Sequence, residues 1–485
     1  MSDPGPSIRW QEREVRGWGE AVRARCAVYR PDSRESAAEA LAGCARDGVA
    51  VALRGAGCSY ADATLNDGGR LLDLSGLDRI LEFDQERGTA RCEPGVTIGQ
   101  LWRRAIPHGW WPAVVPGTMA TTLGGAAAMN IHGKNQYAVG TFGEHVERIT
   151  LLTPRGEVLE CDRQRHGDLF HAAIGGFGML GLILELTVRL KRVHSGRLRV
   201  TALAAHDLEH NLALLEAHRG DADYLVGWLD GHARGAALGR GLLHRADQLA
   251  PGEDPAGEAM LAAERQDVPS RLFGVVPKAW IWPMVWLAVK SGGIRAVNAA
   301  KFAAGLREAR RPPYLQTHGA FHFLLDYVPG WKRAFLPGGL IQFQPFVPAA
   351  AAARVYRALL ERTQREGLVP YLLVLKRHRA DPFLMTHSVD GYSLAMDYAV
   401  RGATRERLWR LCRDMAELVL EAGGRFYYAK DAVLAADAFP RVHGADAVGR
   451  FLALKARVDP AGILQSDLAR RLGVTGRVAG SPARA

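Results

Sequence analysis

Three glycine-rich stretches between Arg54 and Gly181 are the segments of this chain whose spacing most suggests chemistry. They are Arg54–Tyr60 (RGAGCSY), Pro116–Gly125 (PGTMATTLGG) and Gly175–Gly181 (GGFGMLG). Because glycine has no Cβ, backbone N–H groups in such a stretch can close around an anion, and turns of this kind bind pyrophosphate. Together the three stretches predict a site for a phosphate-bearing cofactor.

A Rossmann dinucleotide site is the obvious alternative, but the first stretch lacks its pattern. That pattern needs a third glycine where a helix opens and an acidic residue about 20 positions later. Here Gly57 is followed by CSYA, and residues 61–69 are typical of a turn. Any one stretch alone could be a simple tight turn. Three in succession, the second extended by Gly124–Gly133 (GGAAAMNIHG), favour a cofactor site.

The elements that must position these stretches indicate an α+β chain. Asp32-Ser33 ahead of an Ala-rich segment predicts a capped helix, and Val49–Leu53 predicts a buried strand leading into the first stretch. The composition changes near residue 194, where we expect a second domain. Its predicted strands are 340–347, 371–376 and 392–398, and its predicted helices are 349–366 and 403–422. We interpret this second domain as a sheet with helices on one face.

Composition excludes several classes of protein. With 485 residues, 48% of them hydrophobic and 23% charged, the chain is neither a single small module nor largely disordered. Its six cysteines stand far apart, without the spacing of a disulfide framework or a zinc site, so we expect no metal and a cytoplasmic location. The most apolar run, Ala279–Val289, is well short of the roughly 20 residues that span a bilayer.

The net charge of +11 is concentrated in one segment. Residues 271–311 contain eight basic side chains and one acidic side chain, interleaved with Trp280, Trp282 and Trp286. Basic residues with tryptophans suit the surface of an anionic membrane, although a buried helix with one solvated face would give the same pattern. A nucleic-acid binder is disfavoured because only the charge supports it and no recognition motif accompanies it.

Several motifs resemble those of a known family. The patterns at 54–60 and 116–125, and Asn130–Asn135 (NIHGKN), are similar to the FAD-binding domain of the vanillyl-alcohol oxidase/p-cresol methylhydroxylase (PCMH) superfamily. Within it, Tyr427–Asp431 (YYAKD) and Ser466–Leu472 (SDLARRL) resemble the flavoprotein subunits of decaprenylphosphoryl-β-D-ribose 2'-epimerases. The resemblance covers most of the chain.

The resemblance implies a two-domain α+β architecture of the PCMH type. Residues 1–193 and 425–474 would together form the FAD-binding domain, and residues 194–424 an antiparallel-sheet substrate domain. We expect residues 475–485 to be a disordered tail, since they are rich in Gly, Pro, Ala and Arg.

The resemblance also implies which residues surround the cofactor and the substrate. The cofactor-binding set is Arg54, Gly55, Ala56, Gly57, Cys58, Ser59, Tyr60, Pro116, Gly117, Thr118, Thr122, Leu123, Gly124, Gly125, Met129, Asn130, Ile131, His132, Gly133, Ile183 and Tyr427. The substrate-binding set is Lys134, Gln342, Gln344, Lys376, Ala395 and Lys430. Gln342 and Gln344 are two apart on a predicted strand, so their side chains would point the same way.

The implied reaction is oxidation, by FAD, of the C2' hydroxyl of a polyprenyl-phosphoribose to the keto sugar. A separate NAD-dependent short-chain reductase would complete epimerisation to the arabinose lipid. The enzyme would be peripherally associated with an anionic membrane. Hydride transfer from an alcohol needs a group to receive the hydroxyl proton and positive charge near the flavin. Lys430, His132 and Tyr60 are the catalytic candidates, and the sequence leaves open which of them takes the proton.

An aldonolactone or other soluble-sugar oxidase of the same superfamily remains the alternative. Such enzymes generally share the flavin motifs but lack the Lys430-Asp431 pair and the DLARR tail seen here. One departure bears on the substrate: Ala395 stands where mycobacterial-type relatives have a cysteine, so reagents that attack that thiol should not label this chain.

The residue at position 58 predicts how FAD is held. Many superfamily members bind FAD covalently through a histidine just before the serine of the first motif, and here that residue is Cys58. A histidyl bond cannot form at this position, so we expect the flavin to dissociate. Acid precipitation should leave the yellow colour in the supernatant, and a pellet that stays yellow would contradict the prediction.

Overall fold

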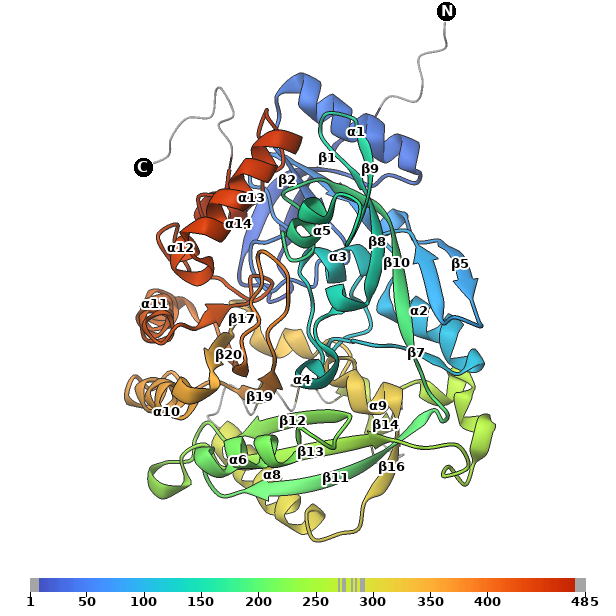
Figure 1. The fold of residues 1–485 in the computed structure, drawn as a ribbon. Helices are drawn as coiled ribbons and strands as arrows, with labels where there is room; N and C mark the ends of the chain where they lie inside the picture. Colours follow the sequence, from blue (N-terminus) through green and yellow to red (C-terminus); the bar gives the residue numbers. More distant parts are fainter. Residues whose placement is uncertain are drawn as a thin grey trace, which may run out of the picture.

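The fold is described from a computed structural model, which places residues 8–268, 271–272, 276–280, 282–283, 286–287 and 293–475 (Figure 1). Two predictions fall partly outside these residues. They are the tail 475–485, of which only Thr475 is described, and the basic segment 271–311, of which Lys290 and several neighbours are not described.

A four-stranded sheet opens the chain, in the order β1-β2-β4-β3. Its members are β1 (Gln11–Arg16), β2 (Arg23–Tyr29), β3 (Val51–Arg54) and β4 (Arg70–Asp73), covered by α1 (Arg34–Asp47). The predicted capped helix is confirmed, because the Ser33 side chain accepts from the Ser36 N–H and Gly48 ends the helix in the left-handed conformation, φ +62°. The predicted strand is also confirmed, and β3 leads directly into the first glycine-rich stretch.

A second sheet has six strands, and the other two glycine-rich stretches lie next to its elements, the second leading from the strand at 110–112 into the helix at 123–128 and the third just before the strand at 182–192. It consists of β5 (Ile80–Asp84), β6 (Thr89–Cys92), β10 (Leu182–Arg192), β8 (Val146–Leu152) and β9 (Val158–Asp162), with β7 (Trp110–Pro112) paired to β10. The helices packed around it are α2 (Ile98–Ala105), α3 (Leu123–Ala128) and α5 (Gly167–Ala173), whereas α4 (Gln136–Val139) contacts the strand at 372–378. Strand β10 begins right after Gly181, so the third stretch is held at the sheet end.

The third sheet has nine strands, and each pair of neighbouring strands in it is antiparallel. Its strands are β16 (Tyr314–Thr317), β11 (Arg197–Ala205), β13 (Gly241–Gln248), β12 (Tyr224–Leu229), β19 (Leu372–His378), β20 (Gly391–Ala399), β18 (Pro345–Pro348) and β21 (Arg425–Phe426), with β17 (Leu340–Phe343) paired to β20. This confirms an α+β, two-domain fold whose substrate domain is built on an antiparallel sheet.

Helices cover both faces of this sheet, which corrects the prediction of helices on one face. The helices α6 (Leu208–His218), α10 (Ala349–Arg365) and α11 (Arg405–Glu421) pack on one face, where Leu243 and Leu375 point. On the opposite face, α8 (Ile294–Glu308) packs through Phe302 against Trp228 and Leu242. Neighbouring strand residues point to opposite faces, so Leu242 and Leu243 serve different layers.

The C-terminal segment returns to the first sheet. Val51 N–H donates to the carbonyl of Ile463, and Gln465 N–H donates to the carbonyl of Val51. The last helices are α12 (Ala438–His443), α13 (Ala445–Val458) and α14 (Asp467–Arg471), which lie beside the N-terminal sheet in Figure 1. Because β21 still pairs with β18, the chain stays in the nine-stranded sheet to Phe426. The domain limits at 193/194 and 424/425 stay predictions.

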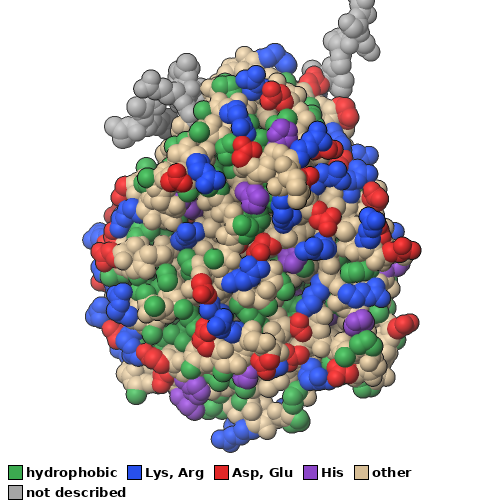
Figure 2. All heavy atoms as spheres, in the orientation of Figure 1, with side chains coloured by type: hydrophobic (Ala, Val, Ile, Leu, Met, Phe, Trp, Pro, Cys, Tyr) green, Lys and Arg blue, Asp and Glu red, His purple; other side chains and the backbone are tan. Residues whose placement is uncertain are grey.

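Surface charge on the face in Figure 2 is mixed, with Lys and Arg side chains lying among Asp and Glu side chains. Within the described residues, no helix is both long and apolar enough to cross a bilayer, and no cluster of His, Cys, Asp or Glu has the geometry of a metal site.

One buried ion-pair group ties the end of the chain to its beginning. The Arg471 guanidinium donates to both carboxylate oxygens of Asp62, at 2.8 Å each, and to Asp431 Oδ2 at 2.7 Å. Asp431 is 2% and Asp62 11% exposed at the side chain, so removing Arg471 would leave two carboxylates with little solvent.

We predict that Arg471→Ala lowers the free energy of unfolding by about 3 kcal/mol, because an uncompensated buried charge is costly. The matched control is Arg457→Ala, which breaks a pair with Asp168 whose two side chains are each about half exposed. It should cost less than ~1 kcal/mol. Urea denaturation of both variants measures this, and equal losses would show that the Arg471 group contributes no more than a surface pair.

Candidate active site

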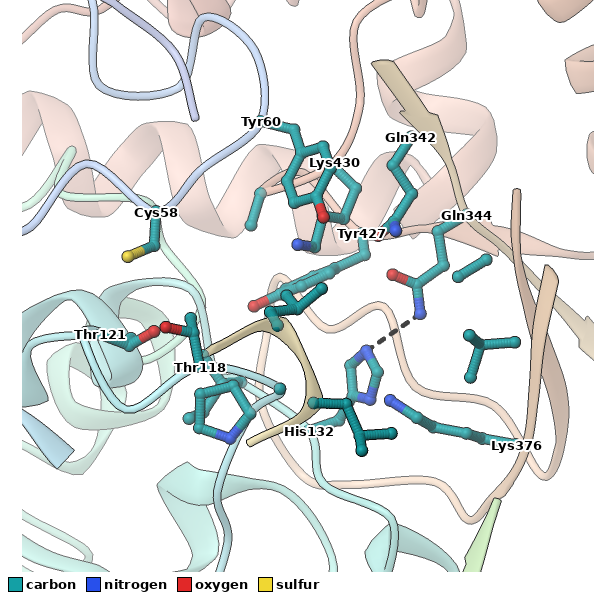
Figure 3. A pocket seen from close by; sticks show the side chains of 18 of the residues that line it. Cys58, Tyr60, Thr118, Thr121, His132, Gln342, Gln344, Lys376, Tyr427 and Lys430 are labelled. Carbon is teal, nitrogen blue, oxygen red and sulfur yellow. Dashed lines mark hydrogen bonds between the residues drawn. The ribbon is translucent and has the colours of Figure 1, made fainter. Parts of the chain in front are cut away.

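A cavity of about 560 Å³ lies between the two smaller sheets and the nine-stranded sheet. Such a volume is typical of small-molecule sites. Its walls come from the loops at 56–60, 115–122 and 427–430, the segment 129–134, and strands β12, β13, β17, β19 and β20. The lining side chains that come from these strands lie on the face of the large sheet that α8 covers. Figure 3 shows ten of the lining residues labelled.

A narrower cavity of about 60 Å³ adjoins it at Met129, which lines both. Each of the three glycine-rich stretches contributes to its wall, through Gly55, Gly124 and Gly178. A Cβ on Gly55 would lie 2.1 Å from Thr122 Oγ1, so only glycine lets the first two stretches touch. The three glycine-rich stretches therefore meet at one cavity wall beside the wide chamber, as a site for an extended phosphate-bearing group such as FAD requires.

Most of the residues expected at the cofactor line one of these cavities. Ala56, Cys58, Ser59, Tyr60, Pro116, Gly117, Thr118, Thr122, Met129, Ile131, His132 and Tyr427 line the wide cavity, and Arg54, Gly55, Gly124, Met129 and Ile183 line the narrow one. In the described structure Gly57, Leu123, Gly125, Asn130 and Gly133 line neither. Asn130 is instead occupied by hydrogen bonds with Asp381 and the N–H of Gly143, which brace the loop.

Every residue expected at the substrate lines the wide cavity. These are Lys134, Gln342, Gln344, Lys376, Ala395 and Lys430. In Figure 3 Gln342, at β17, extends toward Tyr427, and Gln344, in the link between β17 and β18, extends toward His132. Gln344 Nε2 lies 3.0 Å from His132 Nε2. The sequence-based residue roles stay predictions, but the fold brings the candidates to one place.

Lys430 and Tyr60 meet at one end of this cavity. The Lys430 Nζ lies 3.7 Å from the centroid of the Tyr60 ring, and Tyr60 N–H donates to the carbonyl of Ala429. Burial lowers the pKa of Lys430 to about 7, against the opposing effect of the Asp397 charge. The Tyr60 side chain is buried and lines the cavity beside Trp18.

Asp397 is a site residue that sequence reasoning missed. It lies on β20, is 5% exposed, and accepts a 2.5 Å hydrogen bond from Gln342 Nε2. Burial raises its pKa to about 6, although the Gln342 hydrogen bond and the Lys430 charge oppose the rise. A signal was present, because Ala395 was expected at the substrate and a residue two positions away on a strand shares its face.

Four lysines line the wide cavity, and Asp397 is the one carboxylate among its described lining residues. Lys134 is 8% exposed, donates to the carbonyl of Phe321, and has its pKa lowered well below the ordinary value by burial. Burial also lowers the pKa of Lys376 to about 8. Lys301, the second residue missed, comes from α8, and its Nζ lies 4.2 Å from the centroid of the Trp228 ring. Loss of hydration there lowers its pKa to about 8. This electrostatic balance suits an anionic ligand.

Comparison with known proteins agrees with this geometry. Residues 26–162 match the family model described as an FAD binding domain. The chain is 29% identical over 473 residues to decaprenylphosphoryl-β-D-ribose oxidase of Mycolicibacterium smegmatis, covering 95% of this chain and 97% of that protein. It is 31% identical over 388 residues to an uncharacterised protein of Streptomyces coelicolor, covering 78% of this chain and all of that protein.

A further relative covers only part of the chain. L-gulonolactone oxidase of Bos taurus is 28% identical over 196 residues, 40% of this chain and 43% of that enzyme. The matched family model is that of an FAD binding domain, and two of these relatives are named as oxidases. The chain therefore belongs to the FAD-dependent oxidoreductases with a PCMH-type FAD-binding domain.

Proposed function

We propose that this oxidoreductase oxidises the C2' hydroxyl of a polyprenyl-phosphoribose. The observation that carries the proposal is the excess of basic side chains in the wide cavity, four lysines against the one carboxylate of Asp397, in a chain similar over nearly its whole length to a lipid-phosphosugar oxidase. A neutral sugar lactone could accept hydrogen bonds from Lys134, Lys376 and Lys301 but would gain no ion pair with them. A phosphate diester bound among them would offset part of the cost of their burial.

Apolar side chains of the wide cavity support a lipid substituent. Trp228, Leu372 and Val374 line it from the large sheet, and Leu324 and Leu325 line it from the turn at 324–326. Leu324 is 55% exposed, so this apolar surface continues out of the cavity. Apolar surface that continues from an active site to the outside suits a substrate whose long tail stays outside the cavity.

The polar side chains of the cavity would hold the sugar. FAD, when bound, accepts the hydride that leaves the hydroxyl-bearing carbon. Gln342 and Gln344 offer amide groups to sugar hydroxyls. Lys430 provides positive charge at the reacting oxygen, and Asp397 provides a carboxylate for the proton. Lys430 donates to the reacting oxygen as a cation, and the buried carboxylate of Asp397 attracts the departing proton.

Two partners belong to the same proposal. The keto sugar would be consumed by a separate NAD-dependent short-chain reductase, and the lipid would bring the enzyme to an anionic membrane. Trp280, 72% exposed, and Trp286, 40% exposed, support the membrane part. Lys278 of the same basic segment is buried, with its Nζ 3.7 Å from the centroid of the Tyr327 ring, so not all of the predicted basic surface faces outward.

The substrate can be tested anaerobically. We expect prenyl-phosphoribose, supplied in anionic vesicles, to bleach the visible flavin band, and we expect free sugar lactones to leave it unchanged. Bleaching by L-gulonolactone with peroxide formation in air, and none with the lipid, would favour the alternative of a soluble-sugar oxidase that the gulonolactone oxidase similarity supports. Protein that never floats with these vesicles would defeat the membrane part alone.

The role of Lys430 gives a second prediction. In Lys430→Met the first-order rate of bleaching at saturating substrate should fall by about 100-fold or more, because a charge aimed at the reacting oxygen is lost. Lys430 loses its proton near pH 7, so the wild-type rate should decline as pH rises through about 7, and the variant should lack that decline. Lys191→Met is the control, since Lys191 pairs with Asp223 and neither residue lines the cavity. Equal rates in the two variants would exclude the role.

A further inference from the structure

A line of hydrogen bonds runs from the wide cavity into the protein behind it. It joins His132, Gln344, Ser393, His378 and Gln136, which lie far apart in sequence and are all buried. The last three come from β20, β19 and α4 and play no part in the proposed chemistry. At one end of this line the partners are backbone groups, which can only donate or only accept. The direction of each following hydrogen bond can therefore be deduced from that end.

The fixed end is the Gln136 amide, held by the backbone of Arg379. The N–H of Arg379 donates to Gln136 Oε1 at 2.7 Å, and Gln136 Nε2 donates to the carbonyl of Arg379 at 2.7 Å. A backbone N–H only donates and a backbone carbonyl only accepts, so the amide has one orientation. Gln136 Oε1 also lies 3.1 Å from His378 Nδ1. An amide oxygen only accepts, so His378 Nδ1 carries a hydrogen.

The next step passes through Ser393. Burial lowers the pKa of His378 well below its ordinary value, so the ring is neutral and its Nε2 is an acceptor. The Ser393 hydroxyl, 2.7 Å away, therefore donates to His378 Nε2. Its oxygen keeps lone pairs for Gln344 Nε2, which donates to it at 3.4 Å. The Gln344 amide nitrogen thus points toward Ser393.

The second N–H of Gln344 Nε2 faces His132 Nε2, shown by the dashed line in Figure 3. His132 Nε2 must accept it, and because burial, followed by nearby Lys376, lowers the pKa of His132, the ring is neutral. Its hydrogen then sits on Nδ1, which is buried and has no partner among the described residues. Both amide hydrogens of Gln344 are engaged, so toward the cavity this side chain offers only its oxygen.

We propose that Gln136, His378 and Ser393 are positioning residues that hold His132 as its neutral Nδ1–H tautomer. In this tautomer the unpartnered Nδ1–H of His132 is a hydrogen-bond donor, Nε2 is engaged by Gln344 so that His132 does not act as the base, and Gln344 presents an acceptor to a substrate hydroxyl. This assignment rests on the hydrogen-bond geometry together with the neutrality of the two buried rings, and it is independent of which sugar is oxidised. It also removes one of the three catalytic candidates from the role of proton acceptor.

The direct test is the tautomer of His132, measured by nitrogen NMR on protein with ¹⁵N-labelled histidine, with the His132 signals assigned by comparison with His132→Gln. The wild type should show a protonated Nδ1 and a bare Nε2. In Ser393→Ala and His378→Phe the Gln344 amide is free to turn its oxygen toward His132, so the Nε2–H form should appear. Ser393→Thr, which keeps the hydroxyl, should retain the wild-type tautomer.

Tyr356→Phe serves as the matched control, because it removes a buried hydrogen bond to the carbonyl of Tyr392 on the other face of β20. It should leave the His132 signals unchanged. Flavin bleaching at saturating substrate should slow about tenfold in Ser393→Ala and not in Ser393→Thr, the effect of one misplaced hydrogen bond. The proposal would be overturned if His132 of the wild type carried its hydrogen on Nε2, or if the His132 tautomer were the same in Ser393→Ala as in the wild type. Ser393→Ala removes a single atom, so the test stands even if His378→Phe does not fold.

Discussion

The ion-pair group of Arg471, Asp62 and Asp431 is the constraint on which the site depends. Asp62 follows the first glycine-rich stretch, and Asp431 follows Lys430, so one guanidinium fixes the two loops that carry Tyr60 and Lys430. The Tyr60 N–H to Ala429 carbonyl bond then sets the Lys430 ammonium over the Tyr60 ring. The chain must leave the flavin domain, build the nine-stranded sheet and return before this contact can form.

Sequence alone predicted the parts of the site that are contiguous. The stretches at 54–60 and 116–125 and the segment 427–430 are each a single loop, and a loop keeps its neighbours in sequence as neighbours in space. Asp397 and Lys301 were missed because their signals are weak: one is an alternate residue on a strand, and the other lies in a segment interpreted as surface. The sequence cannot predict the His132 tautomer, because the tautomer depends on Gln136, His378 and Ser393, and only tertiary packing brings these residues together.

The same limit explains the error about the large sheet. A strand buried on both faces shows no alternation of polar and apolar residues, so β12, β19 and β20 could not reveal that helices cover both sides. The face that carries Trp228, Val374 and Ala395 is largely apolar, and its polar residues include Lys376 and Asp397 in the cavity wall and Ser393 and His378 behind it, which are the residues that the proposals use. Polar residues on such a strand are therefore the better guide to function.

Buried lysines connect the electrostatics of the cavity with the proposed substrate. Burial lowers the pKa of both Lys376 and Lys301 to about 8, so near pH 8 each carries its charge only part of the time. A phosphate diester favours the charged forms and must raise both pKa values when it binds. Binding of the anion then takes up protons, and its affinity weakens as pH rises through 8. A neutral sugar would show no such linkage, because it does not distinguish an ammonium from an amine by charge.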